Sequence, residues 1–261
     1  VTYVWFDALV NYLSALEYKL SSPSVDRYWP ASVHLVGKDI LTTHAVYWST
    51  MLMALNLPLP ETIFAHGWWT VDGEKMSKSR GNVVDPNQMI DEYGVDPFRY
   101  FLFREVPFGQ DGDFSLSAMI TTINGDLANG IGNLLSRTLT MVDRFCVGLI
   151  PQADTPAIPA LEDRIGKVAT ELPDRIRNGF AALQLRENIQ SIRELVGLCD
   201  EYIDKAAPWQ LAKNQEDRPR LKTVLNTTGR ALRLLSVLLH PYIPNAAEQL
   251  ARQLGLSFDF S

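Results

Sequence analysis

The sequence predicts a mixed fold, with an α/β part followed by an all-α part. Up to about residue 104, helical and strand-like hydrophobic patterns alternate, which is the order typical of β-α-β units. Beyond Ser115 the strand-like runs end, and long stretches with the 3.6-residue period of a helix follow. A chain of 261 residues with 46% hydrophobic residues can bury two modest cores, so we expect two domains.

The elements of the α/β part follow in order along the chain. We expect an amphipathic helix over Phe6–Leu20, a strand over Val33–Val36, a helix over Ile40–Leu55 and a buried strand within Thr62–Gly67. Two strands are too few for a stable open sheet, so we expect the remaining strands to lie in sequence that this chain does not contain. The first residue, Val1, is not methionine, which also indicates a fragment or a processed product.

A short basic segment, Lys75–Ser79, follows the second strand and reads Lys-Met-Ser-Lys-Ser. Two lysines three residues apart, accompanied by serine hydroxyls, can clamp a polyphosphate, and Gly73 and Gly81 give the flanking backbone freedom to move. Asp85 and Pro86 then open a helix. Strand, basic loop and helix together are typical of a nucleotide site, although a solvated hairpin tip explains the two lysines taken alone.

The all-α part is predicted as a bundle of helices. Its helical stretches span Ser117–Val147, Leu161–Phe180, Leu183–Lys205 and Leu221–His240. The third and fourth stretches each draw one stripe that must face other helices, namely Ile189, Ile192, Val196, Cys199 and Ile203, and then Leu221, Leu225, Thr228, Leu232, Leu235 and Leu239. A connector over 149–156 separates the first two stretches, because its prolines do not continue a helix.

Composition limits the classes of protein to which the chain can belong. Its two cysteines, Cys146 and Cys199, form no Cys-x-x-Cys pair, and its four histidines are scattered, so we expect no metal ligated by cysteine and no redox motif. No apolar run is long enough to span a bilayer, and we expect a soluble, cytoplasmic protein. The net charge of −6 argues against indiscriminate nucleic-acid binding, so a contact with RNA needs a local basic face.

The basic loop, with the strand before it and the helix after it, resembles the second signature of the class I aminoacyl-tRNA synthetases. In detail the sequence is similar to methionyl-tRNA synthetases of the bacterial kind, over nearly all of its 261 residues. The resemblance implies that residues 1–114 are the C-terminal part of a Rossmann-type nucleotide-binding domain with a connecting segment, and that residues 115–261 are a helical anticodon-binding domain. It also implies that the absent sequence holds the N-terminal half of the catalytic domain, as a partner of this chain.

The activity implied by the resemblance is that of a ligase of protein biosynthesis. It joins methionine to its tRNA through a methionyl-adenylate formed from ATP with Mg²⁺, and no protein-bound metal is expected in this chain. Lys75 and Lys78 are implied as the catalytic residues. ATP binding is implied for Gly37, Asp39, Trp69, Lys75, Met76, Ser77, Lys78 and Ser79. Because half of the nucleotide site is expected in the absent sequence, we expect no activity from this chain alone.

The first predicted helix carries one face that suits a side-chain pocket. The residues on this face, at helical spacing, are Trp5, Ala8, Leu9 and Tyr12. Spacing alone favours a core stripe, whereas the resemblance implies the wall of a methionine pocket, completed by Asp39, His44 and Trp48. Asp39 has a second interpretation as a helix N-cap, and His44 as an ordinary satisfied histidine. Aromatic rings suit a thioether because its sulfur is polarizable.

The helical part carries two elements that the resemblance assigns to anticodon reading. Asn129, Asn133 and Arg137 recur every four residues, which alone is typical of a solvated polar stripe. The resemblance makes Asn133 and Arg137 readers of base edges. It also implies that Pro208 and Trp209 supply a stacking platform for an anticodon base, while a buried cap on the bundle is the other interpretation of Trp209.

Two alternatives to a methionine enzyme follow from the same features. The isoleucine, leucine, valine and cysteine enzymes of this class share the fold and the basic loop. A non-catalytic tRNA-binding or assembly module is also compatible with a chain that holds only half of a nucleotide site. Three features together favour the methionine enzyme: the Trp-Phe-Asp-Ala segment that begins at Trp5, the pair His44 and Trp48, and the pair Asn133 and Arg137.

Overall fold

The chain forms two compact units, which are described separately. The structure, a computed structural model, describes residues 4–16, 23–71, 73–77, 79 and 81–257. The first unit comprises Val1–Lys75 with Gly109–Asp113, and the second, here called the helical unit, comprises Met76–Phe108 with Phe114–Ser261. The predicted domain boundary between residues 114 and 115 stays a prediction, because compactness and function need not divide a chain at the same residue.

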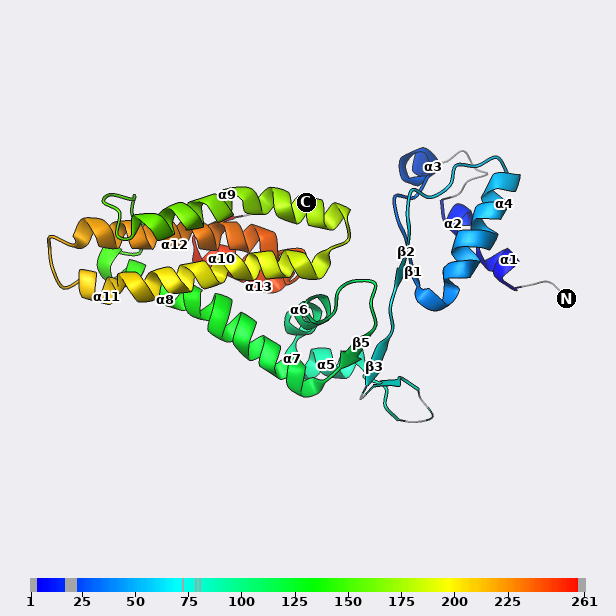
Figure 1. The fold of residues 1–261 in the computed structure, drawn as a ribbon, viewed down its shortest axis with the longest axis horizontal. Coiled ribbons are helices and arrows are strands. Elements are labelled where there is room, and N and C mark those ends of the chain that lie inside the picture. The colour runs from blue at the N-terminus through cyan, green and yellow to red at the C-terminus, as the bar shows by residue number, and fades with distance from the viewer. Residues whose placement is uncertain (1–3, 17–22, 72, 78, 80, 258–261) are drawn as a thin grey trace. The chain divides into compact units, whose positions relative to one another are not determined.

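The first unit contains the predicted β-α-β order (Figure 1). Strands β1 (His34–Gly37) and β2 (Ile63–His66) are parallel, with His34 opposite Ile63 and Gly37 opposite His66. The connection is helical throughout its middle: a 3₁₀ turn η2 (Lys38–Ile40), a π-helical segment η3 (Thr43–Trp48) and an α-helix α4 (Ser49–Ala54). The prediction of a helix over Ile40–Leu55 is thus confirmed, but its wide π turns were not predicted.

The prediction of one long helix over Phe6–Leu20 is wrong in the described part of that range. Two short helices, α1 (Val4–Ala8) and α2 (Asn11–Ser14), take its place, and residues 17–22 lie outside the described residues. The break has a local cause, because the Asn11 side-chain amide donates to the Ala8 carbonyl at 2.8 Å. That side-chain bond competes with the helical backbone bonds. A further short helix, α3 (Pro23–Tyr28), follows.

A second, small sheet in the order β4-β3-β5 was not predicted. It consists of β3 (Trp69–Val71), β4 (Glu74–Lys75) and β5 (Gly112–Phe114). Strands of two or three residues carry too little alternation to be recognised in sequence. Strands β3 and β4 are antiparallel, and Gly73 turns between them with a φ of +74° that favours glycine.

The helical unit begins with α5 (Pro86–Tyr93), whose N-terminus was predicted at Asp85 and Pro86. The Asp85 carboxylate accepts from the Asn87 backbone N–H at 2.9 Å, as an N-cap does. The remaining helices are α6 (Val95–Glu105), α7 (Leu116–Thr122), the π-helical η5 (Ile123–Gly132), α8 (Asn133–Cys146), α9 (Pro159–Ala181), α10 (Leu185–Ala206), α11 (Pro208–Leu211), α12 (Arg218–Leu239) and α13 (Pro244–Gln253). The four predicted helical stretches and the non-helical connector are confirmed.

The core of the helical unit lies between α9, α10 and α12, which pack against one another, and α13, which packs against α12 (Figure 1). Every residue of the two predicted stripes on α10 and α12 is buried. Asn188 of α10 lies so close to Gly179 of α9 that a β-carbon there would meet its side-chain oxygen at 1.8 Å. The glycine therefore sets the distance between these two helices.

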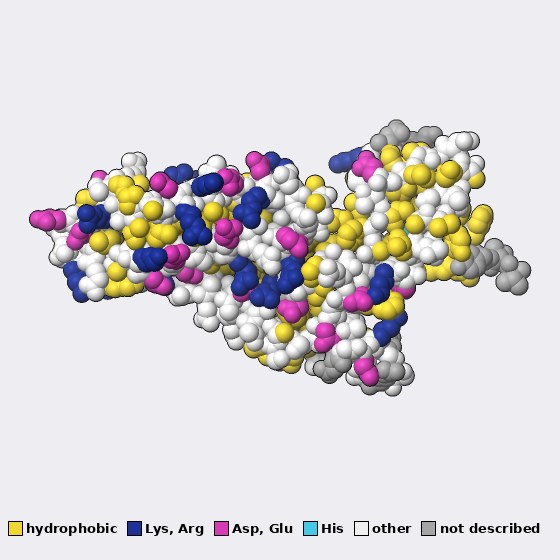
Figure 2. Space-filling view, in the orientation of Figure 1, with side chains coloured by type: hydrophobic (Ala, Val, Ile, Leu, Met, Phe, Trp, Pro, Cys, Tyr) yellow, Lys and Arg dark blue, Asp and Glu magenta, His cyan; other side chains and the backbone are white. Residues whose placement is uncertain are grey.

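The two units differ in the surface that they expose. Hydrophobic side chains gather on the visible face of the first unit, whereas charged side chains of both signs alternate over the helical unit (Figure 2). In the first unit Val4, Phe6 and Met53 are 75%, 62% and 63% exposed. Within the described part of the chain, none of the helices is both long and apolar enough to cross a membrane.

Candidate functional site

An aromatic cluster occupies the first unit between α2, β1 and η3. It contains Tyr12, Trp29, His34, His44 and Trp48, with neighbouring ring centroids 4.4 to 6.3 Å apart. The π-helical segment η3 carries both His44 and Trp48, and β1 begins with His34. The structure therefore brings together three of the predicted pocket residues, Tyr12, His44 and Trp48.

Hydrogen bonds fix which nitrogen of His44 carries its proton. The His44 Nδ1 lies 2.9 Å from the backbone carbonyl of Ile40, and a carbonyl only accepts, so Nδ1 is the protonated nitrogen. In the neutral ring Nε2 then accepts from the Tyr12 hydroxyl, at 2.8 Å. The tyrosine and the histidine hold one another in place.

His34 is a member of the cluster that sequence reasoning missed. The indole N–H of Trp48 donates to His34 Nε2 at 3.1 Å, so this nitrogen carries no proton. Burial, with a smaller effect of the neighbouring His44, lowers the pKa of His34. Trp29 was also missed, and its buried indole nitrogen has no hydrogen-bond partner among the described residues. No spacing rule connects residues 12, 29, 34 and 44, which explains both omissions.

The other predicted pocket residues lie in different environments. Leu9 and Trp48 are fully buried, and they form an apolar cluster with Leu13 and Leu52. Trp5 and Ala8 are half-buried on α1, whereas Asp39 is exposed in η2. The N-cap interpretation of Asp39 does not hold, since Gly37 is the cap residue and η2 has no side-chain cap bond. A contact of these residues with methionine stays a prediction.

The basic loop begins at the end of β4, and its first lysine lies over an indole. The Lys75 Nζ is 4.1 Å from the centre of the Trp68 ring, and the Lys38 Nζ is 4.0 Å from the same centre. Lys38 donates to Asp111 at 2.6 Å, and the Trp68 backbone N–H donates to the same carboxylate at 2.8 Å. These two hydrogen bonds lower the pKa of Asp111. Lys38, Trp68 and Asp111 were all missed from sequence.

The predicted ATP-binding residues lie partly on strands and partly in the basic loop. Gly37 ends β1, where a β-carbon would meet the Asp39 carboxylate at 2.7 Å, and Trp69 begins β3, half-buried. Beyond Lys75, the Ser77 backbone N–H donates to the Asn82 side chain at 2.8 Å, and the hydroxyls of Ser77 and Ser79 lie 2.8 Å apart. Met76 is half-buried. Lys78 lies outside the described residues.

Hydrogen bonds to Asp113 hold the hairpin that carries Lys75. The Asp113 carboxylate accepts from the Thr70 hydroxyl at 2.6 Å and from the Gly73 backbone N–H at 2.8 Å. These hydrogen bonds lower the pKa of Asp113. The two carboxylates of Asp111 and Asp113 therefore fix the base and the turn of the hairpin.

In the helical unit, the structure brings Arg137 and Trp209 together. The Arg137 guanidinium lies 5.8 Å from the centre of the Trp209 ring and pairs with Asp204 at 2.6 Å. Trp209 is 44% exposed, which disfavours the interpretation of a buried cap. Asn133 is exposed one turn before Arg137 on α8. Ala207, in the left-handed conformation, ends α10 so that Pro208 begins the next helix.

The acidic neighbours of this pair were not predicted. One carboxylate oxygen of Asp200 is buried without a hydrogen-bond partner among the described residues. Burial raises the pKa of Asp200, Arg137 opposes that rise, and Asp204 adds to it. The Arg137 guanidinium and the exposed Asp204 carboxylate thus give this face donors and an acceptor, which is what the edges of unstacked bases require.

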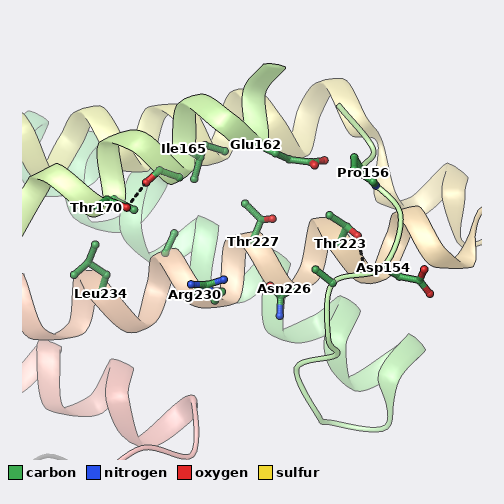
Figure 3. A pocket seen from close by; sticks show the side chains of 14 residues that line it. Asp154, Pro156, Glu162, Ile165, Thr170, Thr223, Asn226, Thr227, Arg230 and Leu234 are labelled. Atoms are coloured by element: carbon green, nitrogen blue, oxygen red, sulfur yellow. Dashed lines mark hydrogen bonds between the residues drawn. The ribbon is translucent and has the colours of Figure 1, made fainter. Parts of the chain in front are cut away.

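A cavity of about 470 Å³ lies elsewhere in the helical unit, between α9, α12 and the connector (Figure 3). The polar side chains that line it form hydrogen bonds that hold neighbouring parts of the helical unit together. Glu162 accepts from the backbone N–H groups of Ala157 and Ile158 at the start of α9, and from the Tyr202 hydroxyl. Asp154 is held through its backbone N–H by the Thr223 hydroxyl at 2.9 Å. None of the predicted site residues lines this cavity. Across the described residues, no group of His, Cys, Asp and Glu side chains is placed to hold a metal ion.

Comparison with known proteins bears on both units. The family model "tRNA synthetases class I (M)" matches residues 1–139, and the model "Anticodon binding domain of methionyl tRNA ligase" matches residues 152–259. The chain belongs to the methionyl-tRNA synthetase family. This confirms the predicted family and the predicted fold class, a partial Rossmann-type domain followed by a helical anticodon-binding domain.

Individual members of the methionyl-tRNA synthetase family are similar along the whole chain. A methionine–tRNA ligase of Caldanaerobacter subterraneus subsp. tengcongensis is 46% identical over 262 residues, covering 100% of this chain and 41% of the relative. The Bacillus subtilis ligase is 42% identical, covering 98% of this chain and 39% of the relative. A solved structure of the Mycobacterium tuberculosis synthetase in complex with methionyl-adenylate matches with a TM-score of 0.94 at 41% identity, over 98% of this chain and 51% of that one. The chain therefore spans about two fifths of the length of the curated relatives that it matches.

Proposed function

We propose that this chain is part of an enzyme that joins methionine to its tRNA through a methionyl-adenylate. The observation that carries the proposal is that one chain of 261 residues matches both the synthetase model and the anticodon-binding model of the same family. The methionyl-adenylate in the Mycobacterium tuberculosis structure supports the intermediate. We further propose that the N-terminal half of the catalytic domain is the partner that completes the site.

The methionine side chain is proposed to bind at the aromatic cluster. Trp5, Ala8, Leu9, Tyr12, Asp39, His44 and Trp48 are the proposed contacts. The His44 ring is held in place by the Tyr12 hydroxyl and the Ile40 carbonyl, and a fixed aromatic ring suits a polarizable thioether. Shape discriminates by only about 1–3 kcal/mol per methylene, so close analogues are expected to be rejected imperfectly.

The adenylation step is proposed to run without a covalent enzyme intermediate. A methionine carboxylate oxygen forms a bond to the α-phosphorus of ATP, the bond from that phosphorus to the bridging oxygen breaks, and pyrophosphate leaves with the electron pair. Lys75 and Lys78 stabilise the charge that grows on the leaving group. Mg²⁺ enters bound to ATP and shares that task. Gly37, Asp39, Trp69, Met76, Ser77 and Ser79 are proposed to complete the nucleotide contacts. A terminal ribose hydroxyl oxygen of the tRNA then forms an ester bond to the methionyl carbonyl carbon and loses its proton to water, while the bond from that carbon to the phosphate oxygen breaks and AMP leaves.

The tRNA is proposed to be identified at the face around Arg137. Asn133 and Arg137 supply hydrogen-bonding groups for base edges, and Pro208 positions Trp209 as a platform for one base. Exposure of the indole beside a guanidinium supports this role, because both groups stack on bases. The net charge of −6 requires such a local site.

Complementation tests the catalytic proposal. This chain is mixed with the remaining part of a family member, and ATP–pyrophosphate exchange with methionine is measured. We expect exchange from the mixture and none from either part alone, and we expect Lys78→Ala to lower the exchange rate more than it weakens methionine binding. Exchange that appears with isoleucine but not with methionine would contradict the substrate.

A non-catalytic tRNA-binding module is the second candidate, favoured by the exposed Trp209 beside the half-buried Arg137 in a unit with its own core. Binding of methionine tRNA is measured for the chain and for Trp209→Ala, with Leu149→Ala as the matched control at an exposed apolar position of the same unit. We expect a loss of about 1–3 kcal/mol in the first variant only. Binding of tRNA without recoverable exchange would replace the enzyme proposal with this module.

A further inference from the structure

We propose that Lys38 and Lys75 form a two-ammonium site for the polyphosphate of ATP or for free pyrophosphate, on the Trp68 indole as a platform. In this site Asp111 is an internal counter-ion, which the phosphate groups displace. The inference rests on the proposed function and deepens it, because Lys38, Trp68 and Asp111 lie outside the basic loop that suggested nucleotide binding.

The two ammonium groups converge on one ring. Each lies about 4 Å from the centre of the Trp68 ring, so the two nitrogen atoms are within about 8 Å of one another. Lys38 follows β1 and Lys75 ends β4, and the tertiary fold therefore brings them together from sites 37 positions apart in the sequence. Like charges at this separation repel, and an anion with oxygens at both ends relieves that repulsion.

Asp111 already places an anionic group at the Lys38 end of this site. Its carboxylate accepts from the Lys38 ammonium at 2.6 Å and from the Trp68 backbone N–H at 2.8 Å, which are the two kinds of donor that phosphate oxygens use. The side chains of Lys38 and Asp111 are 35% and 51% exposed, so a ligand can reach both. A half-exposed carboxylate is also readily replaced, since water solvates it when it leaves.

The backbone holds Asp111 against Trp68 by close approach. A β-carbon on Gly67 would meet the Gln110 carbonyl oxygen at 2.2 Å, so only glycine lets the segment before Asp111 lie along the segment before Trp68. The Gly112 backbone N–H donates to the Trp68 carbonyl at 2.9 Å on the other side. The carboxylate is therefore presented to the two donors by a fixed backbone, and its displacement needs only a rotation of its own side chain.

The other interpretation is an ion pair that only stabilises the fold, and the two make opposite predictions for one substitution. Asp111→Asn keeps an oxygen that accepts from the Trp68 N–H and removes the charge that competes with phosphate. A competing counter-ion predicts tighter anion binding in this variant. A purely structural ion pair predicts unchanged or weaker binding.

Calorimetric titration of the 261-residue chain with inorganic pyrophosphate tests the site. We expect Asp111→Asn to bind about threefold more tightly and Lys38→Gln about tenfold more weakly, with Lys38→Arg recovering most of the affinity. The matched control is Lys205→Gln, because Lys205 pairs with Glu201 at 2.6 Å in the helical unit, and this variant should bind as the unsubstituted chain does. Far-UV circular dichroism and tryptophan fluorescence establish that each variant is folded.

Unchanged binding in Lys38→Gln, no gain in Asp111→Asn, or no binding of millimolar pyrophosphate to the unsubstituted chain would each overturn the inference. Titration with ATP–Mg²⁺, pyrophosphate and AMP identifies the phosphate source, and AMP should not bind because it lacks a polyphosphate. The complementation assay reads out the proposed function separately. Exchange that survives intact in Lys38→Gln would remove Lys38 from the site and leave the enzyme proposal standing.

Discussion

The two units of this chain bury their hydrophobic residues to different degrees. The helical unit encloses a continuous core in which the facing stripes of α10 and α12 are buried throughout. The first unit has a small apolar cluster around Trp48, a two-stranded parallel sheet and large exposed apolar side chains. Parallel sheets are normally covered on both faces. The difference teaches that the helical unit encloses its own hydrophobic core, whereas the first unit leaves large apolar side chains exposed.

Chemical denaturation gives the largest effect that this comparison predicts. Five of the six tryptophans, all except Trp209, lie in the first unit, so fluorescence in a Trp209→Phe background reports that unit alone. Circular dichroism reports mainly the helices. We expect the fluorescence midpoint in urea to lie about 1 M or more below the midpoint by circular dichroism, because the first unit buries less apolar surface. Coincident midpoints would contradict the expectation that the first unit is less stable than the helical unit.

A core substitution in the helical unit should give the next largest effect. Leu235 is fully buried on α12, and Leu235→Ala removes buried methyl groups and leaves a cavity. We expect a loss of about 3 kcal/mol in the free energy of unfolding, measured by urea titration with circular dichroism. Val237→Ala is the matched control on the same helix, at an exposed position, and should cost less than about 0.5 kcal/mol.

Removal of the Tyr12 hydroxyl tests whether the first unit can be destabilised without the helical unit. Tyr12→Phe deletes the hydrogen bond to His44 Nε2 and leaves the ring in the cluster. We expect a loss of about 1 kcal/mol in the stability of the first unit by fluorescence, with the circular-dichroism midpoint unchanged. A shift of both midpoints together would mean that the units unfold as one.

Acidification should produce the smallest effect, again confined to the first unit. Burial lowers the pKa of His34 in the folded state, so the unfolded chain binds a proton more readily there. Stability from this group is therefore present above the ordinary histidine pKa of about 6.5 and is lost as the pH falls through it. Protonation would place a hydrogen on Nε2, against the Trp48 indole N–H. Urea titrations at pH 7.5 and 5.5 measure the change, and His34→Asn should abolish it.

The elements that sequence predicted well are those with long periodic patterns or strong local signals. The stripes on α10 and α12 extend over many turns, and Asp85 with Pro86 marks a helix start through contacts within two residues. The short strands β3 and β4 and the break between α1 and α2 were missed. A side-chain bond such as that of Asn11 to Ala8 outweighs a weak helical pattern over a few residues.

By itself, the sequence determined the fold class, the family, the bundle helices and the basic loop, because periodicity and signature motifs are properties of neighbouring residues. Only the tertiary structure decided that His34 and Trp29 join Tyr12, His44 and Trp48, and that Asp111 meets Lys38 from 73 positions away. It also decided that the Arg137 guanidinium lies over the Trp209 ring and forms an ion pair with Asp204. Such contacts depend on the register of strands and on close approaches such as that of Gly67 to Gln110, and neither has a local pattern in the chain.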